Sequence, residues 1–410
     1  MRDVTASRTA RFEILRLAYH YHVPAWRRPD GRVLTSSTEG RFLDSLASHC
    51  EQLVCFLHEP RDEERRGLDY VFDSPNLRWV SFGRHASTPE RTLFPWRFTQ
   101  PLTRWRDRLD ALLLRGPSPL LPATARQAAG LPIAMLLVGD YEAVVNDLPQ
   151  PALRKAAIRY WAGWNRRGQQ AVGRDALTLV NSEELYQRWN PALPHVVSVR
   201  TTNLRCADFQ VREDTCESRP YRLLYAGRMD RGKGLLVMVD AVAQLVERGE
   251  NVLLDLVGPE QPGDPILAEV ASLAADLGIR ERIVYHGSRP IGLELYAFHR
   301  RADVFVQASL QTEGFPRAIW EGLANSLPVV ATSVGGIPLV LKDRETARLV
   351  EPRSAPALAK GIGDVISGRV LRRRLIRNGR RLAESNTLER RTREMADLLR
   401  DWGRATKHGI

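Results

Sequence analysis

The stretch that decides the fold reads Glu313-Gly-Phe-Pro-Arg-Ala-Ile-Trp-Glu321. Pro316 fits the first turn of a helix, because the N–H that proline lacks would have no partner there. Gly314 and Phe315 then offer free backbone N–H groups at a helix N-terminus, which favours a polar or anionic ligand. Glu313 precedes that helix and Glu321 lies inside it. The two acids are therefore expected to face one cleft at different depths.

The flanking sequence supports this interpretation. Residues 302–309 read as a short buried strand, and residues 325–338 read as another strand followed by a turn at Gly335 and Gly336. Strand, loop, helix, strand and glycine-rich loop is the order in which open α/β sheets build ligand crevices. Spacing alone leaves a second interpretation open, an exposed pair of acids on an amphipathic helix.

A second candidate site lies upstream. The sequence Arg222-Leu-Leu-Tyr-Ala-Gly-Arg-Met-Asp-Arg-Gly-Lys-Gly234 indicates a buried strand that ends in a loop, and a helix is expected over residues 235–248. A guanidinium at Arg228 and an ammonium at Lys233, beside a helix N-terminus, would form a diphosphate clamp. The loop glycines that allow close approach are Gly227, Gly232 and Gly234.

The same loop mimics a P-loop in the spacing from Gly227 to Gly232-Lys233. The next residue is Gly234, where a P-loop needs a Ser or Thr hydroxyl for magnesium. The sequence therefore disfavours a nucleoside triphosphatase. A loop whose basic residues are merely solvated remains open for either cation taken alone.

Taken together, these motifs resemble the retaining glycosyltransferases of the GT-B fold, family 4, also called glycosyl transferases group 1. The resemblance covers Tyr221–Pro352, and the N-terminal half matches only loosely. It implies an α/β fold of two Rossmann-like βαβ domains facing a central cleft, with a C-terminal helix that crosses back to the N-terminal domain. The matching pieces are Gly227-Arg228 with Lys233-Gly234, Val257-Gly258-Pro259, Val284 to Gly287, Ala302 to Ser309, Glu313 to Glu321, and Pro328 to Pro338.

The resemblance also implies roles. A nucleotide-diphosphate-sugar donor would bind the second domain, and a glycan or lipid-linked acceptor would bind the first. Arg228 and Lys233 would stabilise the departing diphosphate, Glu313 would hold the donor sugar, and Glu321 would hold the ribose. The implied donor-binding set is Gly227, Arg228, Lys233, Gly258, His286, Gly287, Glu313, Gly314, Phe315, Glu321, Gly335 and Gly336.

The first half departs from the family pattern at Asp140. Many relatives carry a histidine after the strand that here ends Leu136-Leu-Val-Gly-Asp140. Asp140 either takes over that contact with the donor sugar, as a catalytic residue, or simply ends a strand. His20 and His22 are expected beyond the first strand, where a histidine is more often a polar loop residue than a catalyst.

Alternating strands and helices organise the first half, which predicts a parallel sheet with helices on both faces. We expect domains at 1–205 and 221–385, a linker at 206–220, and a C-terminal helix within 386–410 that packs back on the first domain. The expected strands of the first half are Phe12–Leu17, Leu53–Leu57, Leu77–Phe82, Ala111–Leu114, Ile133–Val138 and Leu177–Val180, and the expected helices are Gly40–His49, Pro119–Ala129 and Pro151–Arg166.

The composition is that of a globular protein, with 43% hydrophobic and 26% charged residues over 410 residues. The net charge of +12 would suit an anionic membrane or a nucleic acid, and no nucleic-acid motif is visible. The four cysteines lack zinc-type spacing, and no signal peptide is evident, so a cytoplasmic location with reduced thiols is expected. Aromatic residues and arginines interleave over Leu93–Arg115, which is typical of a helical stretch in peripheral contact with the inner face of the cell membrane. The same pattern leaves open an amphipathic helix that packs on its own sheet and keeps a solvated basic face.

No cofactor and no metal are expected, since the sequence has no Asp-x-Asp triplet to hold a cation on the diphosphate. Two other functions stay open. One is a nucleotide-sugar epimerase or hydrolase of the same fold, and the other is a non-catalytic assembly module.

Overall fold

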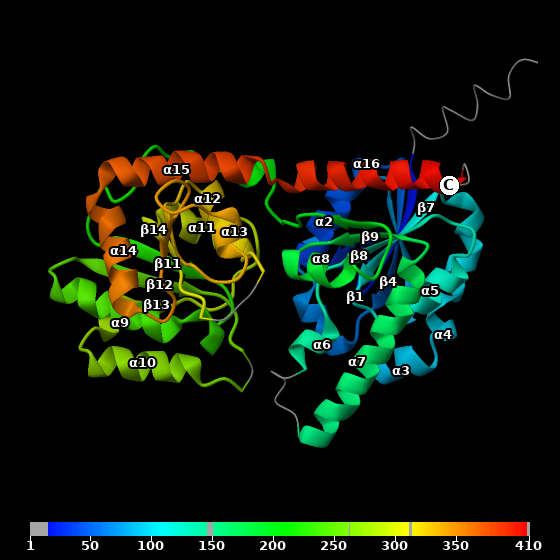
Figure 1. Ribbon diagram of the computed structural model, residues 1–410, viewed down its shortest axis with the longest axis horizontal. Coiled ribbons are helices and arrows are strands. Elements are labelled where there is room, and N and C mark those ends of the chain that lie inside the picture. The colour runs from blue at the N-terminus through cyan, green and yellow to red at the C-terminus, as the bar shows by residue number, and fades with distance from the viewer. Residues whose placement is uncertain (1–14, 146–150, 262, 311–313, 408–410) are drawn as a thin grey trace, which may run out of the picture. The chain divides into compact units, whose positions relative to one another are not determined.

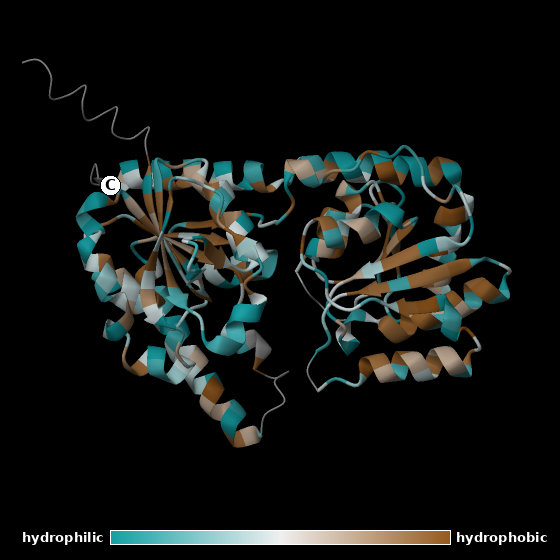
Figure 2. Ribbon diagram, turned by 180° about the vertical axis from the view of Figure 1, so that it is seen from behind, coloured by the Kyte–Doolittle hydropathy of each residue, from teal (hydrophilic) through white to brown (hydrophobic). Residues whose placement is uncertain are grey.

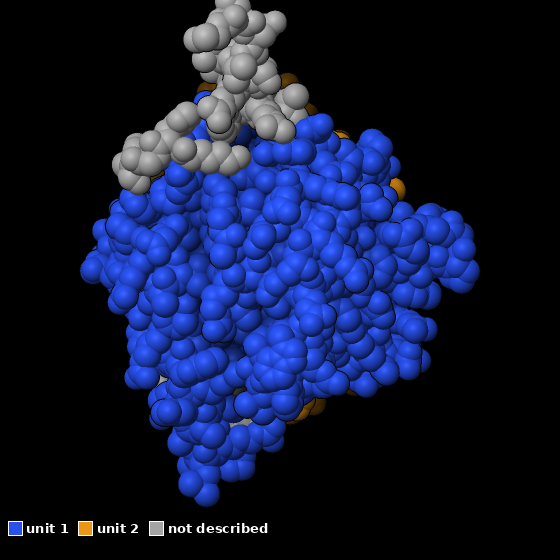
Figure 3. Space-filling view, turned by 90° about the vertical axis from the view of Figure 1, so that its right-hand side faces the viewer, with its two compact units in different colours: residues 1–201, 389–410 blue, residues 202–388 orange. Residues whose placement is uncertain are grey.

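The computed structural model describes residues 15–145, 151–261, 263–310 and 314–407. The chain divides into two compact units (Figure 3). The first consists of residues 1–201 and 389–410, and the second of residues 202–388. Residues 206–220, the expected linker, belong to the second unit in this division.

The first unit is built on a parallel sheet of seven strands within the described residues (Figure 1). The strand order is β10-β9-β8-β7-β1-β4-β6. The strand bounds are Arg16–Pro24 (β1), Gln52–Glu59 (β4), Leu77–Arg84 (β6), Ala111–Gly116 (β7), Ile133–Leu137 (β8), Leu177–Val180 (β9) and Val196–Ser198 (β10). Short strands Trp26–Arg27 (β2), Val33–Thr35 (β3) and Tyr70–Val71 (β5) form a small antiparallel sheet beside it.

Helices connect these parallel strands, because a parallel crossover needs a long connection. Their bounds are Ser37–Ala47 (α2), Thr88–Leu93 (α3), Trp96–Thr99 (α4), Leu121–Gln127 (α5), Tyr141–Val144 (α6), Ala152–Gly173 (α7) and Glu183–Trp189 (α8). Gly40 lies inside α2, which begins at Ser37, and glycine fits there because a Cβ would clash with the ring of Tyr70.

The second unit contains a parallel sheet of six strands in the part of the chain that the structure describes. The strand order is β13-β12-β11-β14-β15-β16. The bounds are Tyr221–Ala226 (β11), Val252–Val257 (β12), Ile283–Tyr285 (β13), Val304–Gln307 (β14), Val329–Thr332 (β15) and Arg348–Val350 (β16). Figure 2 shows these strands as mostly apolar, as expected for a sheet covered on both faces.

The helices of the second unit run between and after those strands. Their bounds are Leu235–Glu247 (α9), Ile266–Asp276 (α10), Leu293–Arg301 (α11), Arg317–Ala324 (α12), Ile337–Val340 (α13), Ala355–Ser367 (α14) and Arg369–Glu384 (α15). The last helix, Leu388–Lys407 (α16), belongs to the first unit apart from its first residue. It contacts α2 through a 2.8 Å hydrogen bond between the hydroxyls of Ser45 and Thr392. Among the described residues, no helix is long and apolar enough to cross a bilayer.

The predicted α/β class with two Rossmann-like parallel sheets and a returning C-terminal helix is confirmed. Residues 12–14 of the expected first strand lie outside the described residues, and β1 runs from Arg16 to Pro24, so it continues beyond the expected end at Leu17 and includes His20 and His22. Backbone pairing of β1 with β4 and β7 continues through His20. This pairing offsets the cost of polar side chains in the strand, and those side chains hid the strand in the sequence pattern.

The stretch Leu93–Arg115 does not form one amphipathic helix. It divides into the end of α3, then α4, two 3₁₀ turns and the strand β7. Pro95 and Pro101 interrupt any longer helix because proline lacks the N–H and clashes with the preceding turn. Arg115 is not on a basic surface, since its Nη1 donates to the buried carboxylate of Glu39 at 2.6 Å.

In each sheet the order in which strands are added reverses beside the first strand. β1 lies between β4 and β7, and β11 lies between β12 and β14. In open parallel sheets, ligands bind outside the carboxyl ends of the strands at this reversal. The loops after β11 and β14 are therefore the first place to look for a site in the second unit.

Candidate functional site

The loops after β11 and β14 contact each other at the strand reversal. Gly234 adopts φ +71°, and a Cβ on it would lie 2.1 Å from the carbonyl oxygen of Ala308. The amide of Leu310 donates to the carbonyl of Gly232 at 2.8 Å. Glycine is needed at 234 both for its backbone angle and for this close approach. The sequence predicted these glycines as a means of close approach, and here the approach is to the neighbouring loop.

A second pair of glycines joins the ends of β11, β12 and β13. Gly258 has φ +145°, and a Cβ on it would lie 1.8 Å from the carbonyl oxygen of Gly227. Its amide donates to the carbonyl of Gly287 at 3.0 Å. Three of the predicted donor-binding glycines therefore lie together at one edge of the sheet.

The two predicted cations lie in the loop between β11 and α9. Arg228 is exposed, and its Nη2 lies 3.7 Å from the carboxylate of Asp230. The hydroxyl of Tyr225 donates to the Arg228 carbonyl at 2.8 Å, which fixes the backbone at the start of the loop. Lys233 is half-buried in a 3₁₀ turn directly before Gly234 and α9. A solvent-facing guanidinium and a helix N-terminus thus lie on the same loop, as an anion site requires.

The loop before α12 meets the glycine turn before α13. A Cβ on Gly336 would lie 3.0 Å from the amide nitrogen of Phe315 and 3.1 Å from the carbonyl carbon of Gly314. Gly335 has φ +54°. The predicted contributions from Gly314, Phe315, Gly335 and Gly336 are therefore brought to one place by the fold.

Of the two predicted acids, Glu321 lies within the described residues. Glu313 lies outside the described residues. Glu321 lies in α12 and is 7% exposed. A carboxylate that is nearly buried at a site edge needs polar partners, and it can accept hydrogen bonds from hydroxyls that enter the site.

The structure directs the side chain of His286 toward Asp255. Its Nε2 lies 2.6 Å from Oδ1 of Asp255, whose side chain is 2% exposed. Arg222 also pairs with Asp255 at 3.1 Å. His286 therefore belongs to a polar network next to β12, and its contact with the donor stays a prediction. The neighbouring Tyr285, which the sequence reading missed, donates its hydroxyl to the Gly258 carbonyl at 3.0 Å and is 36% exposed.

Asp140 lies in the first unit, where it caps the short helix α6. Its Oδ1 accepts from the amide of Glu142 at 2.8 Å, and its other carboxylate oxygen pairs with Arg188. These contacts suffice to explain an acid at the end of a strand. Its predicted catalytic role stays a prediction.

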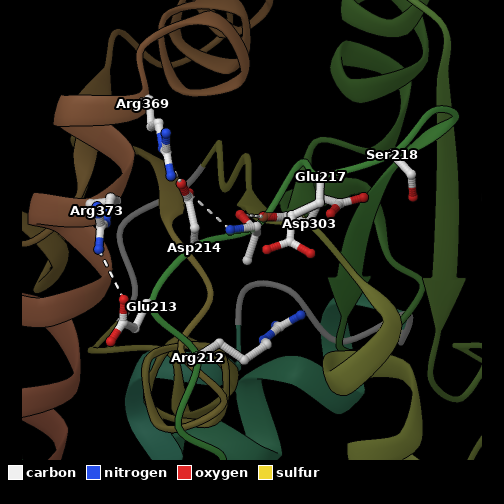
Figure 4. A pocket seen from close by; sticks show the side chains of 9 residues that line it. Arg212, Glu213, Asp214, Glu217, Ser218, Asp303, Arg369 and Arg373 are labelled. Carbon is white, nitrogen blue, oxygen red and sulfur yellow. Dashed lines mark hydrogen bonds and ion pairs between the residues drawn. The ribbon is translucent and has the colours of Figure 1, made fainter.

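A polar hollow of about 450 Å³ in the second unit is distinct from this site (Figure 4). Its charges neutralise one another, because Arg369 pairs with Asp214 at 3.0 Å and Arg373 pairs with Glu213 at 2.9 Å. The carboxylate of Asp303 accepts from two backbone amides at 2.8 Å. These contacts hold this part of residues 206–220 on the second unit.

Comparison with known proteins identifies a family for the second unit. Residues 209–382 match the family model described as "Glycosyl transferases group 1". A GDP-mannose-dependent alpha-(1-6)-phosphatidylinositol monomannoside mannosyltransferase of Mycolicibacterium smegmatis is 32% identical over 141 residues, which are 33% of this chain and 36% of that protein. A D-inositol 3-phosphate glycosyltransferase of Corynebacterium glutamicum is 32% identical over 145 residues, 35% and 34% of the two chains. The chain thus matches about a third of the length of these relatives.

Solved structures resemble the chain over nearly its whole length. A glycosyltransferase of Rickettsia africae has a TM-score of 0.70 at 17% identity and covers 95% of this chain and 98% of its own. A sucrose-phosphate synthase of Thermosynechococcus elongatus has a TM-score of 0.68 at 20% identity, covering 94% and 98%. An Anabaena protein solved in complex with UDP and glucose has a TM-score of 0.66 at 16% identity, covering 94% and 100%. These likenesses confirm the predicted GT-B fold class.

Proposed function

We propose, from the membership of residues 209–382 in the glycosyl transferases group 1 family, that the chain is a retaining family 4 glycosyltransferase. It would move a sugar from a nucleotide-diphosphate-sugar to a glycan or lipid-linked acceptor, in bacterial polysaccharide or glycoconjugate synthesis. One observation carries this proposal. Arg228 and Lys233 lie on a glycine-rich loop that contacts the loop leading to Glu313, at the strand reversal where ligands bind.

The chemistry that such a loop supports is stabilisation of a departing diphosphate. As the bond from the sugar to the phosphate breaks, negative charge grows on the phosphate oxygens. The cations of Arg228 and Lys233 would stabilise that charge, by about 1.5–3 kcal/mol for each charge-assisted hydrogen bond. The phosphate oxygen that leaves would accept the proton of the acceptor hydroxyl. This route needs no separate general base.

The acids and the remaining glycines would orient the donor. Glu313 would hold hydroxyls of the donor sugar, beside the amides of Gly314 and Phe315, and Glu321 would hold the ribose. We also propose that the reaction is independent of metal ions, because fixed cations can neutralise the diphosphate charge. A cytoplasmic location would place the enzyme beside its nucleotide-sugar pool.

We further propose peripheral contact with an anionic membrane through α3, α4 and α7. Leu93 and Trp96 are 63% and 56% exposed, and Leu153 of α7 is 89% exposed. The indole of Trp161 donates to the Thr92 hydroxyl at 3.0 Å, so α7 lies beside α3. Exposed arginines accompany these apolar residues, as suits the headgroup boundary. The chain should co-sediment with anionic vesicles at low salt and not at high salt, and failure at low salt would exclude this contact.

The test of the main proposal is a thermal-unfolding screen against a panel of nucleotide sugars. A ligand at about 100 times its Kd stabilises the folded chain by about 2.7 kcal/mol. A stabilising donor would then be incubated with and without acceptor extract, each with and without EDTA. We expect sugar transfer only when acceptor is present, at the same rate with and without EDTA. Donor turnover without acceptor would indicate an epimerase or hydrolase, and the absence of any binding would indicate an assembly module.

A further inference from the structure

Several histidines gather at the carboxyl ends of β1, β4 and β6 in the first unit. His20 and His58 are fully buried, and their ring centroids lie 6.1 Å apart. The ring of His85 lies 5.4 Å from that of His58. These residues come from neighbouring strands, beside the strand reversal at β1 and β7 where a ligand of this unit is expected.

The orientation of these rings is fixed by their Nδ1 atoms. Nδ1 of His20 lies 2.8 Å from the carbonyl of Phe56, and Nδ1 of His58 lies 3.3 Å from the carbonyl of Gly83. Nδ1 of His85 lies 2.6 Å from the carboxylate of Glu64. Carbonyl and carboxylate oxygens only accept, so Nδ1 carries the proton in each ring. The Nε2 atoms are left as the groups that can meet a ligand.

Arg91 of α3 belongs to the same cluster. It is 5% exposed, and its charge lowers the pKa of His20, His22, His58 and His85, which places it near all four. The carboxylate of Glu64 is the nearby acid, and it is already bonded to Arg61 at 2.8 Å and to His85. The cluster therefore carries an excess of positive charge.

Several polar atoms of this cluster are buried without hydrogen-bond partners in the described structure. They are Nε2 of His20, His58 and His85, Nδ1 of His22, and Nε and Nη1 of Arg91. A buried guanidinium without a partner is costly, because a protein interior does not replace the water that it loses. Within the described residues, no group of three His, Cys, Asp or Glu side chains is placed to hold a metal ion.

We propose that Arg91 and the surrounding histidines form a binding site for a phosphate group of the ligand that the first unit recognises. The guanidinium donates an N–H to a phosphate oxygen, an interaction that suits arginine and oxyanions. That this ligand is the acceptor rests on the function proposed above. The phosphate site itself rests only on the first unit.

Phosphate binding should be accompanied by proton uptake. Burial and the Arg91 charge lower the pKa of His20 to about 4 and that of His58 to about 2, so both rings are neutral at neutral pH. An anion beside Nε2 favours the protonated ring and raises these pKa values. The other charged or titratable groups near the cluster are Arg61, Glu64, Arg115 and Tyr141. Affinity for the anion should therefore increase as the pH falls.

The experiment is calorimetry of inorganic phosphate binding to the full chain and to Arg91→Gln. We expect the variant to bind phosphate at least about tenfold more weakly, since one charge-assisted contact is lost. The control is Arg97→Gln, because Arg97 is an exposed arginine of the adjacent helix α4 and should leave phosphate affinity unchanged. Equal phosphate affinity of the wild-type chain and Arg91→Gln, or no binding by either, would overturn the proposal.

A stability measurement separates binding from a purely structural role of Arg91. In phosphate-free buffer, Arg91→Gln should unfold at a higher temperature than the wild-type chain, because an unpaired buried charge is removed. In phosphate the order should reverse. A variant that is less stable in both buffers would contradict the site. Sulfate, whose charge does not change over this range, should bind more tightly at about pH 6 than at about pH 8.

Two competitors identify the source of the phosphate. Glycerol 3-phosphate tests a soluble phosphate ester, and vesicles of phosphatidylglycerol test a lipid headgroup. Displacement by either one supports the proposal and assigns the ligand class, and displacement by neither would overturn the assignment to an acceptor. Nucleoside diphosphate binding to the second unit should be the same in Arg91→Gln. If the wild-type chain bound phosphate but no nucleoside diphosphate, the proposed function would fail while the phosphate site stood.

Discussion

The two units place their candidate sites at equivalent positions and build them differently. In the second unit, Arg228 and Lys233 lie five residues apart on one loop, and glycines close that loop against its neighbours. In the first unit, the cluster around Arg91 takes side chains from β1, β4, the residue after β6 and helix α3, spread over residues 20 to 91. A site built by backbone and glycine is visible as a local motif, whereas a site built by side chains from separate strands is not.

The largest expected effect is on the loop cations. Arg228→Ala and Lys233→Ala should each reduce turnover by about 100-fold, as loss of one electrostatic contact to a transition state typically does. Arg231→Ala is the matched control, because Arg231 lies on the same loop but pairs with Asp264 and Glu269. Its turnover should stay close to wild type. Wild-type rates for both Arg228→Ala and Lys233→Ala would show that the loop is not the diphosphate site.

The next largest effect is expected for the glycines that close the loop. Gly258→Ala should destabilise the second unit by about 3 kcal/mol, because the new Cβ meets the Gly227 carbonyl and the backbone angle is unfavourable for alanine. Gly278→Ala is the control, since it has φ +68° with open space around it, and should cost about 1 kcal/mol. Hydrogen exchange of peptides from the second unit measures the loss of stability in both variants. Equal losses of stability in the two variants would mean that the close approach of Gly258 to the Gly227 carbonyl does not contribute to the effect of the substitution.

Acid should destabilise the first unit more than the second. The folded state loses stability as the pH falls below about 6.5 when it contains a buried histidine whose folded pKa lies below its unfolded value of about 6.5. Only the unfolded chain then takes up the proton. The loss continues down to the folded pKa, which is about 4 for His20 and about 2 for His58. In the second unit, burial lowers the pKa of His299 to about 4.

Each such histidine costs up to about 1.4 kcal/mol per pH unit in that window. Hydrogen exchange at about pH 7 and about pH 5, corrected for intrinsic rates, should therefore show a steeper loss of protection in β1 and β4 than in β11 and β12. His58→Gln should reduce the difference. Parallel losses in the two sheets would contradict the pKa shifts assigned to the first unit.

The smallest expected effect separates the two acids of the second unit. Glu321→Ala should weaken the free nucleoside diphosphate by about tenfold, the equivalent of one hydrogen bond to a charged group. Glu313→Gln should reduce turnover and leave that affinity nearly unchanged, because Glu313 is proposed to hold the sugar. Calorimetry with the free nucleotide measures both affinities, and equal losses in the two variants would refute this division.

In the second unit, the sequence correctly predicted the elements around the candidate site, which are β11, α9, β14, α12 and β15. Apolar runs followed by Gly227, Gly258 or Gly335 located the strand ends, because local backbone chemistry determines where a parallel strand stops and a tight loop begins. It also predicted a C-terminal helix within 386–410, which the structure places at Leu388–Lys407. It ended β1 too early, because His20 and His22 broke the apolar pattern, and it joined the residues around Pro95 and Pro101 into one helix.

By itself, the sequence determined which segments become strands, where their loops are tight, and that two parallel sheets result. Those properties depend on residues close together in the chain, through hydrophobic periodicity and glycine angles. The tertiary structure alone decided that Glu39 neutralises Arg115, that His286 faces Asp255, and that Nε and Nη1 of Arg91 are buried without hydrogen-bond partners. Those pairings depend on which strands become neighbours, so the same charged residue can end on the surface, in an ion pair or in a binding site.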